Sequence, residues 1–197
     1  MGLTPVAKGG LAAIVTSLEM TSRPVPRPMP ASPFRLIRWK TPEISKYRAL
    51  FQRVGAPWLW YSRLAITDAQ LSAIIHDPHV EIFAAVDAAG IEVGMLELDF
   101  RQPHSCKLSY FALIPELTGK GHGRWLMAHA LAMGWRKGIE RLWVHTCTLD
   151  HPSALNFYLR SGFRAFQREI EIFSDPRVSG LLPREAAPHV PLLDAES

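Results

Sequence analysis

Cysteine is scarce in this chain, because only Cys106 and Cys147 occur among its 197 residues. Two cysteines are too few for a disulfide framework and are typical of a reducing compartment. The longest apolar runs, such as residues 10–15, are far shorter than the about 20 residues that span a bilayer. An apolar stretch follows Lys8 as in a signal peptide, but it lacks a clean cleavage site and Glu19 interrupts it. These absences predict a cytoplasmic protein with no membrane partner.

Charge of one sign is not clustered anywhere in the sequence. The 22 Lys and Arg residues and 18 Asp and Glu residues are scattered, with a net charge of +4. A basic stripe with interleaved aromatic residues is absent, so no nucleic-acid partner is predicted. The positive excess fits a mixed solvated surface or a polyanionic ligand. His76 and His79 lack a third ligand at useful spacing, so no metal site is predicted.

Proline marks both ends of the predicted domain. Five prolines in residues 21–33 exclude a helix or a central strand there and predict an extended connector. Residues 1–33 are therefore interpreted as an N-terminal extension, and residues 34–173 as the folded domain. Residues 174–197 contain four prolines and no hydrophobic periodicity, which indicates a C-terminal tail.

Hydrophobic periodicity and turn residues give the order of elements within that domain. A capping box at Thr67 and Gln70 begins one helix, and residues 87–90 form a hairpin turn. Strands are predicted over residues 34–39, 81–86, 91–100, 107–114, 142–148 and 163–173. Helices are predicted from Pro42 to Gly55, from Thr67 to Asp77, from the glycine-rich turn to Gly138, and from Pro152 to Gly162. The middle hairpins and the later crossover helix predict a mixed sheet in an α+β or α/β domain.

A glycine-rich turn is the most informative motif. Gly119, Gly121 and Gly123 lie between a predicted strand and a predicted helix, where backbone N–H groups and the helix dipole favour an anion. A dinucleotide fingerprint fails because Arg124 or Leu126 stands where glycine or alanine is needed. A P-loop fails because Gly121 stands where Ser or Thr is needed.

The turn resembles the signature of the GNAT superfamily of N-acetyltransferases, Gln/Arg-x-x-Gly-x-Gly/Ala. Gly121 and Gly123 occupy its two small-residue positions, and Thr118 replaces the usual Gln or Arg. The residues that match the wider family pattern are Pro115, Glu116 and Gly119.

A second block resembles the family's Asn-x-x-Ala-x-x-x-Tyr-x-x-x-Gly-Phe. Its positions are held by His151, in place of Asn, and by Ala154, Tyr158, Gly162 and Phe163. The resemblance covers roughly residues 35–173. It implies a mixed, mostly antiparallel central sheet flanked by helices, with acetyl-CoA as the acyl-donor cosubstrate.

The resemblance also implies site residues. Backbone N–H groups near Phe111 and Leu113 would stabilise the oxyanion and pair with the pantetheine arm. Tyr158 matches the family's general acid, although an aromatic residue there also packs a buried face. The residues expected to bind the coenzyme are Phe111, Leu113, Gly119, Lys120, Gly121, His122, Gly123, Arg124 and His151.

The general base has several candidates in the sequence. The position of the glutamate in histone acetyltransferase members is Lys107 here, so that carboxylate is not carried over. Glu97 is taken as the catalytic carboxylate and Asp99 as a substrate ligand, with a solvated strand face as the alternative for both. His145 is another candidate base, with a structural histidine as its alternative.

The acceptor is expected to meet an aromatic loop between the first two helices. Trp58, Trp60 and Arg63 suit an aromatic, planar or carboxylate-bearing acceptor, and an aromatic cluster that anchors the core is the alternative. The predicted function is transfer of an acetyl group to a primary amine of a small molecule. A protein N-terminal or lysine acetyltransferase and a non-catalytic acyl-CoA sensor stay open, as does a homodimer.

Overall fold

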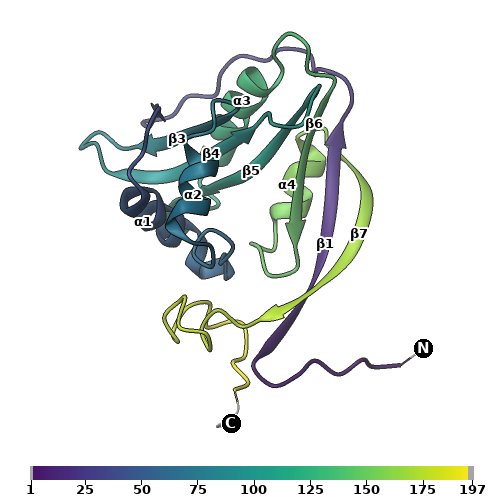
Figure 1. Ribbon diagram of the computed structural model, residues 1–197. Helices are drawn as coiled ribbons and strands as arrows, with labels where there is room; N and C mark the ends of the chain where they lie inside the picture. The colour runs from purple at the N-terminus through teal and green to yellow at the C-terminus, as the bar shows by residue number, and fades with distance from the viewer. Residues whose placement is uncertain (1, 195–197) are drawn as a thin grey trace.

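The computed structural model of the chain describes residues 2–194 and contains one seven-stranded sheet with helices on both faces (Figure 1). The strands are β1 (Gly10–Met20), β2 (Arg35–Trp39), β3 (Val80–Val86), β4 (Glu92–Asp99), β5 (Ser105–Leu113), β6 (Arg141–Cys147) and β7 (Arg164–Ser174). The α-helices are α1 (Ile44–Gly55), α2 (Asp68–Ile75), α3 (His122–Gly134) and α4 (Ala154–Arg160). Two short 3₁₀ turns cover Ala56–Trp58 and Pro115–Leu117.

The strand order is β2-β3-β4-β5-β6-β1-β7. Every neighbouring pair is antiparallel except β5 and β6, which run parallel. The predicted mixed, mostly antiparallel sheet of an α+β fold is therefore confirmed.

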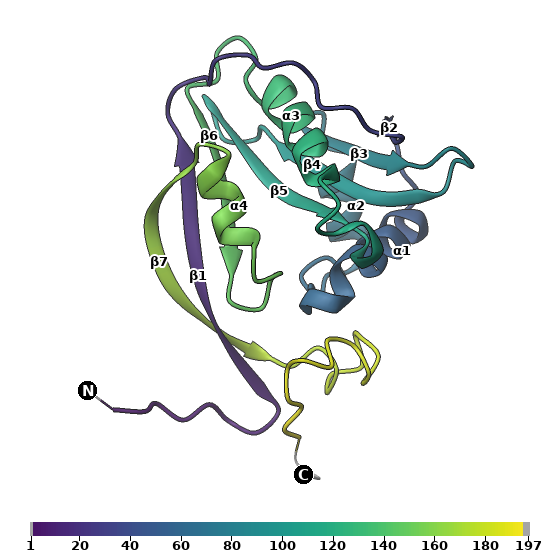
Figure 2. The same ribbon diagram turned by 180° about the vertical axis from the view of Figure 1, so that it is seen from behind.

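Helices α1 and α2 cover one face of the sheet, and α3 and α4 cover the other (Figures 1 and 2). Tyr47 and Phe51 of α1 and Leu126 and Ala130 of α3 are almost fully buried, because each faces the sheet. Most side chains of β3 and β4 are buried on both faces, which explains their nearly continuous apolar sequence. β7 is an edge strand with exposed side chains along almost its whole length.

Residues 10–20, which the proline-rich stretch separates from the predicted domain, form strand β1 inside the sheet. β1 lies between β6 and β7 and pairs with both, for example Val15 with Cys147 and Ile14 with Ile170. Leu18 is fully buried in the main core. Both partner strands lie at the far end of the chain, so no local pattern in residues 10–20 reveals this pairing.

The C-terminal segment folds back although it has no periodic pattern. Asp175 and Arg177 form an ion pair of 2.7 Å in which each side chain is only 2% exposed. The Arg177 guanidinium also donates a hydrogen bond of 2.8 Å to the carbonyl of Val190, which closes the segment on itself. Leu182 packs in a small cluster with Leu59, so this segment supports the loop that follows α1.

Local signals set several element ends as predicted. Thr67 and Gln70 form the capping box of α2, and the Asp87 carboxylate accepts hydrogen bonds from backbone N–H groups in the β3–β4 turn. Helix α3 ends at Gly134, earlier than the predicted Gly138, because Trp135 leaves helical geometry and buries its ring. Among residues 2–194, no helix is both long and apolar enough to cross a bilayer.

Candidate active site

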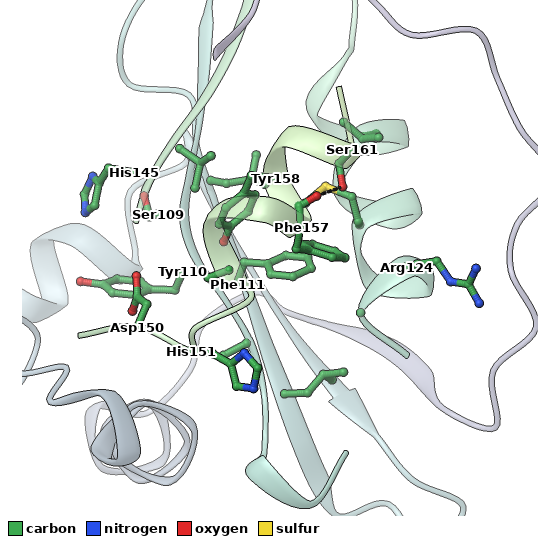
Figure 3. Close-up of a pocket in the computed structure, with 18 of the residues that line it drawn as sticks. Ser109, Tyr110, Phe111, Arg124, His145, Asp150, His151, Phe157, Tyr158 and Ser161 are labelled. Atoms are coloured by element: carbon green, nitrogen blue, oxygen red, sulfur yellow. Dashed lines mark hydrogen bonds between the residues drawn. The ribbon is translucent and has the colours of Figure 1, made fainter. Parts of the chain in front are cut away.

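The site begins where β5 and β6 separate. Their parallel pairing covers only three residue pairs, the last of them Lys107 with Trp143. Beyond that pair, residues 108–113 of β5 and Val144, His145 and Cys147 of β6 border a cavity of about 1570 Å³ (Figure 3). The register of β4 and β5 also shifts between Glu97 and Leu98, which places a bulge beside the opening. The opening therefore leaves one edge of β5 free to face a ligand.

The glycine-rich turn lies at one side of this cavity. Gly119 and Gly121 have φ values of 79° and 86°, which favour glycine because a Cβ would be strained there. Within residues 2–194, the backbone N–H groups of residues 119–123 have no hydrogen-bond acceptor. These donors lie at the beginning of α3, where the helix dipole adds positive potential. The turn therefore has the donors and the backbone shape of an anion site.

The predicted coenzyme-binding residues do not all face the cavity. Lys120 and His122 do not line it, and the His122 ring instead packs edge-on against Phe34 at 4.8 Å. In Figure 3 the Arg124 side chain points away from Phe157 and Tyr158. The members of the predicted set that line the cavity are Phe111, Leu113, Gly119, Gly121, Gly123, Arg124 and His151.

Tyr158 of α4 is 7% exposed, and the centre of its ring lies 6.1 Å from the centre of the Phe111 ring. Its hydroxyl points into the cavity and has no hydrogen-bond partner in the described chain (Figure 3). Burial, and then the charge of Asp150, raise the pKa of Tyr158 far above its ordinary value. The phenol therefore stays protonated and available as a donor across any ordinary assay pH.

Glu97 does not line the cavity, in contrast to the predicted catalytic position. Its fully buried carboxylate accepts hydrogen bonds of 2.6 Å from the Tyr47 hydroxyl and 2.7 Å from the Arg63 guanidinium. Both carboxylate oxygens of Glu97 are therefore hydrogen-bonded. The Arg63 guanidinium in turn lies over the Tyr110 ring. This geometry suits a residue that positions Arg63 rather than one that takes a proton from an amine.

Asp99, Lys107 and His145 do line the cavity. The Asp99 carboxylate forms an ion pair of 2.6 Å with the Arg101 guanidinium. Burial alone would raise the pKa of Asp99, but the hydrogen bonds from Arg101 outweigh burial and the pKa is lowered. Burial lowers the pKa of Lys107, whose ammonium lies 4.7 Å from the centre of the Trp143 ring. The His145 side chain is exposed to the solvent in the cavity. Partial burial by the cavity walls, and then the positive charge of Lys107, disfavour the charged imidazole and lower the pKa of His145. A neutral imidazole therefore faces the cavity at neutral pH.

The aromatic loop is tied to several surrounding elements. The Trp60 indole donates a hydrogen bond of 3.0 Å to Asp150. Trp60 also packs tightly on α1, because a Cβ added at Gly55 would lie only 2.6 Å from the Trp60 side chain. Tyr61 donates to Glu171 of β7 at 3.0 Å. Trp58, Trp60 and Arg63 all line the cavity. The loop is thus an anchored cluster and a cavity wall at once, so the two readings of it do not exclude each other.

Sequence reasoning missed several residues that shape this site. Asp150 holds Trp60, Thr146 and the backbone of Cys147, and Tyr110 hydrogen-bonds Ser62 at 2.6 Å. None of these belongs to a motif, and only the strand position of Tyr110 gave any signal. In the described part of the chain, no group of three metal-ligating side chains is gathered.

We expect Glu97→Gln to lower the free energy of unfolding by about 3–5 kcal/mol, because Arg63 loses its buried counter-charge. The KM for the acceptor should also rise, because Arg63 is expected to contact the acceptor. Glu171→Gln is the matched control, since this exposed carboxylate also accepts from a tyrosine and should cost about 1 kcal/mol or less. Urea unfolding and acceptor kinetics measure both effects. A variant with normal stability and KM but a lower kcat would instead give Glu97 a chemical role.

Solved structures share this fold at low sequence identity. A protein of unknown function from Staphylococcus epidermidis is 13% identical, with a TM-score of 0.59, covering 85% of this chain and 63% of that one. A GCN5-related N-acetyltransferase from Sphaerobacter thermophilus is 17% identical, with a TM-score of 0.60, covering 86% and 52%. An aminoglycoside acetyltransferase from an uncultured soil sample is 18% identical, with a TM-score of 0.54, covering 66% and 88%. This chain thus spans less than two thirds of the length of the first two.

Family membership comes from the sequence itself. No curated protein matches the chain significantly. The model of the acetyltransferase (GNAT) family, however, matches residues 42–163, which is more than half of the chain and includes the glycine-rich turn, the opening and Tyr158. The chain therefore belongs to the GNAT acetyltransferase family.

Proposed function

We propose that this protein is an N-acetyltransferase that transfers the acetyl group of acetyl-CoA to a primary amine of a small molecule. The observation that carries the proposal is the opening between β5 and β6, which adjoins a turn of unpaired backbone N–H groups. The turn suits the pyrophosphate of the coenzyme, and the free edge of β5 suits its amide-bearing arm. Both features fit one ligand because they line one cavity.

The coenzyme supplies the acetyl group as a thioester, which an amine attacks directly. In this proposal the backbone around Phe111 and Leu113 donates a hydrogen bond to the carbonyl oxygen as negative charge develops there. The Tyr158 hydroxyl donates to the departing sulfur. Burial disfavours a thiolate as it disfavours a phenolate, so the same environment raises the proton affinity of the sulfur that Tyr158 serves.

His145 is the better-placed general base in this arrangement. It lines the cavity, its lowered pKa keeps it neutral, and no described residue hydrogen-bonds its ring. Glu97 lacks access because Tyr47 and Arg63 occupy its carboxylate. His145 would take the proton that the ammonium group of the acceptor must lose before attack.

Arg63 suits a carboxylate or a planar polar group on the acceptor. Its Nη2 is held by Glu97 and its Nε by Tyr47, whereas Nη1 has no partner among residues 2–194. A guanidinium fixed in this way pays little further entropy when it binds an anion. Trp58 and Trp60 add apolar walls next to it.

Gly121→Asp should abolish acetyl-CoA binding while the protein stays folded. The new side chain is strained at φ 86° and brings a carboxylate to the pyrophosphate position. Wild-type protein at roughly 100 times the dissociation constant should gain about 2.7 kcal/mol of stability, and the variant should gain none. Thermal unfolding with and without acetyl-CoA measures this. If wild-type protein shows no shift at millimolar acetyl-CoA, the proposed function fails.

Tyr158→Phe should lower kcat about 10²- to 10⁴-fold, as expected for a positioned acid, and leave acetyl-CoA affinity unchanged. The ring packing is retained, so the hydroxyl is the only group lost. Because the pKa of Tyr158 lies far above the assay range, the loss should be constant from about pH 6 to pH 9. Thiol release at saturating acetyl-CoA measures it. A change within a few-fold would make Tyr158 a packing residue.

His145→Gln should remove the acidic limb of the kcat profile. The rate of the wild-type enzyme should fall only at a pH below the ordinary histidine pKa of about 6.5, because burial lowers the pKa of His145 and the imidazole is protonated below that lowered pKa. His129→Gln is the matched control: burial also lowers the pKa of His129, but it does not line the cavity. An unchanged profile in the His145 variant would assign the limb to another group. Binding without any thiol release across a panel of amines would indicate an acyl-CoA sensor instead.

A further inference from the structure

The proline-rich connector forms an outer wall of the cavity. We call residues 23–30 the strap; each of them lines the cavity, together with one side of α3 and the C-terminal end of α4. The strap lies on the path from β1 to β2, which occupy distant positions in the sheet, and it passes over α3 (Figure 2). The cavity therefore continues from the β5–β6 opening to the space beneath the strap.

The strap is attached at its two ends. Near one end, a Cβ on Gly162 would lie 3.3 Å from the Met20 side chain, which places Met20 beside the end of α4. Near the other end, Phe34 packs against His122 and Trp125 in the first turns of α3. Among residues 2–194, no hydrogen bond joins residues 23–30 to any other part of the chain. The connector that contains the strap thus runs from the end of α4 to the beginning of α3, and no hydrogen bond in the described chain joins the strap to either helix.

Positive charge is concentrated at this part of the cavity. Arg23 and Arg27 of the strap, Arg124 of α3 and Arg160 of α4 line it, and none has an ion-pair partner in the described chain. The cavity-lining carboxylates are committed elsewhere: Asp99 binds Arg101, Asp150 binds Trp60, and Glu171 binds Tyr61. The strap end of the cavity therefore attracts an anion.

A buried donor at the same end lacks an acceptor. Trp135 lines the cavity and is 6% exposed, and its indole N–H has no hydrogen-bond partner in the described chain. An unpaired buried donor is costly, but this N–H is shielded from solvent, so the Trp135 ring meets the cavity as an apolar wall. The small side chains of Ala128 and Ala132 border the same space on α3. The cavity between these alanines and the strap thus offers apolar walls to a flat ring.

We propose that the strap and α3 bind the phosphorylated nucleoside end of the acyl donor, with Arg23 and Arg27 contacting its 3′-phosphate. This inference rests on the proposed function. The glycine-rich turn, which suits the pyrophosphate, lines the same cavity as the strap. A nucleoside leaving that position along α3 passes directly beneath the strap. Arg124 lies beside Gly121, within 3.5 Å of an added Cβ, and bridges the two anionic groups.

Calorimetric titration with coenzyme A and with 3′-dephospho-coenzyme A tests the contact without requiring catalysis. The wild-type protein should bind coenzyme A about tenfold to hundredfold more tightly, as expected when charge-assisted hydrogen bonds to a phosphate are lost. The double variant R23A/R27A should bind the two ligands within about threefold of each other, at the wild-type affinity for the dephosphorylated one. Arg35→Ala is the matched control, since this arginine follows the strap but does not line the cavity, and it should keep the wild-type preference.

Each result decides between the two proposals. If the wild-type protein binds neither ligand, the proposed function fails together with this inference. If it binds both equally, or if R23A/R27A keeps the full preference for coenzyme A, the strap inference is overturned while the proposed function stands. Equal weakening of both ligands in the double variant would also overturn it, because the strap would then act only as a wall. Loss of the preference with intact binding of the dephosphorylated ligand supports it.

Discussion

The separation of β5 from β6 is the constraint on which the rest of the structure depends. Two strands that part inside a sheet each lose a ladder of hydrogen bonds on one edge, so each must be held firmly on its other edge. β4 holds β5, and β1 holds β6. Because β1 comes from the beginning of the chain, the N-terminal segment stabilises the strand that forms one side of the opening. The connector that follows β1 must then return across the α3 face to reach β2.

Several polar groups around the opening are fixed by hydrogen bonds to other parts of the chain. Glu97 and Tyr47 hold Arg63 from below, Asp150 holds Trp60 from the side, and the segment folded around Arg177 packs beneath the same loop. Tyr158 and His145 also line the cavity, but no hydrogen-bond partner among residues 2–194 holds either side chain. This division separates the groups that maintain the shape of the site from those free to exchange a proton.

Short-range patterns in the sequence predicted much of the fold and several of the residues that line the cavity. The glycine-rich turn, the Thr67 capping box and the Asp87 turn depend on neighbours a few residues apart, and all three are present. β1 was missed because its partners lie at the other end of the chain. The position of Glu97 was missed because strand alternation assigns it to a face but does not reveal that α1 covers that face with Tyr47. The positions of the strap and of the folded tail were not predicted. Neither segment has hydrophobic periodicity, and both positions depend on contacts with distant parts of the chain.

The central claim is that the opening between β5 and β6 receives the thioester. A crystal structure of the protein with bound acetyl-CoA tests it most directly. The account predicts that the pyrophosphate lies on the N–H groups of residues 119–123. It also predicts that the thioester carbonyl oxygen lies about 3 Å from a backbone nitrogen near Phe111 or Leu113, with the sulfur within reach of the Tyr158 hydroxyl. A coenzyme bound outside this cavity, with the β5–β6 opening filled by protein side chains, would contradict the account.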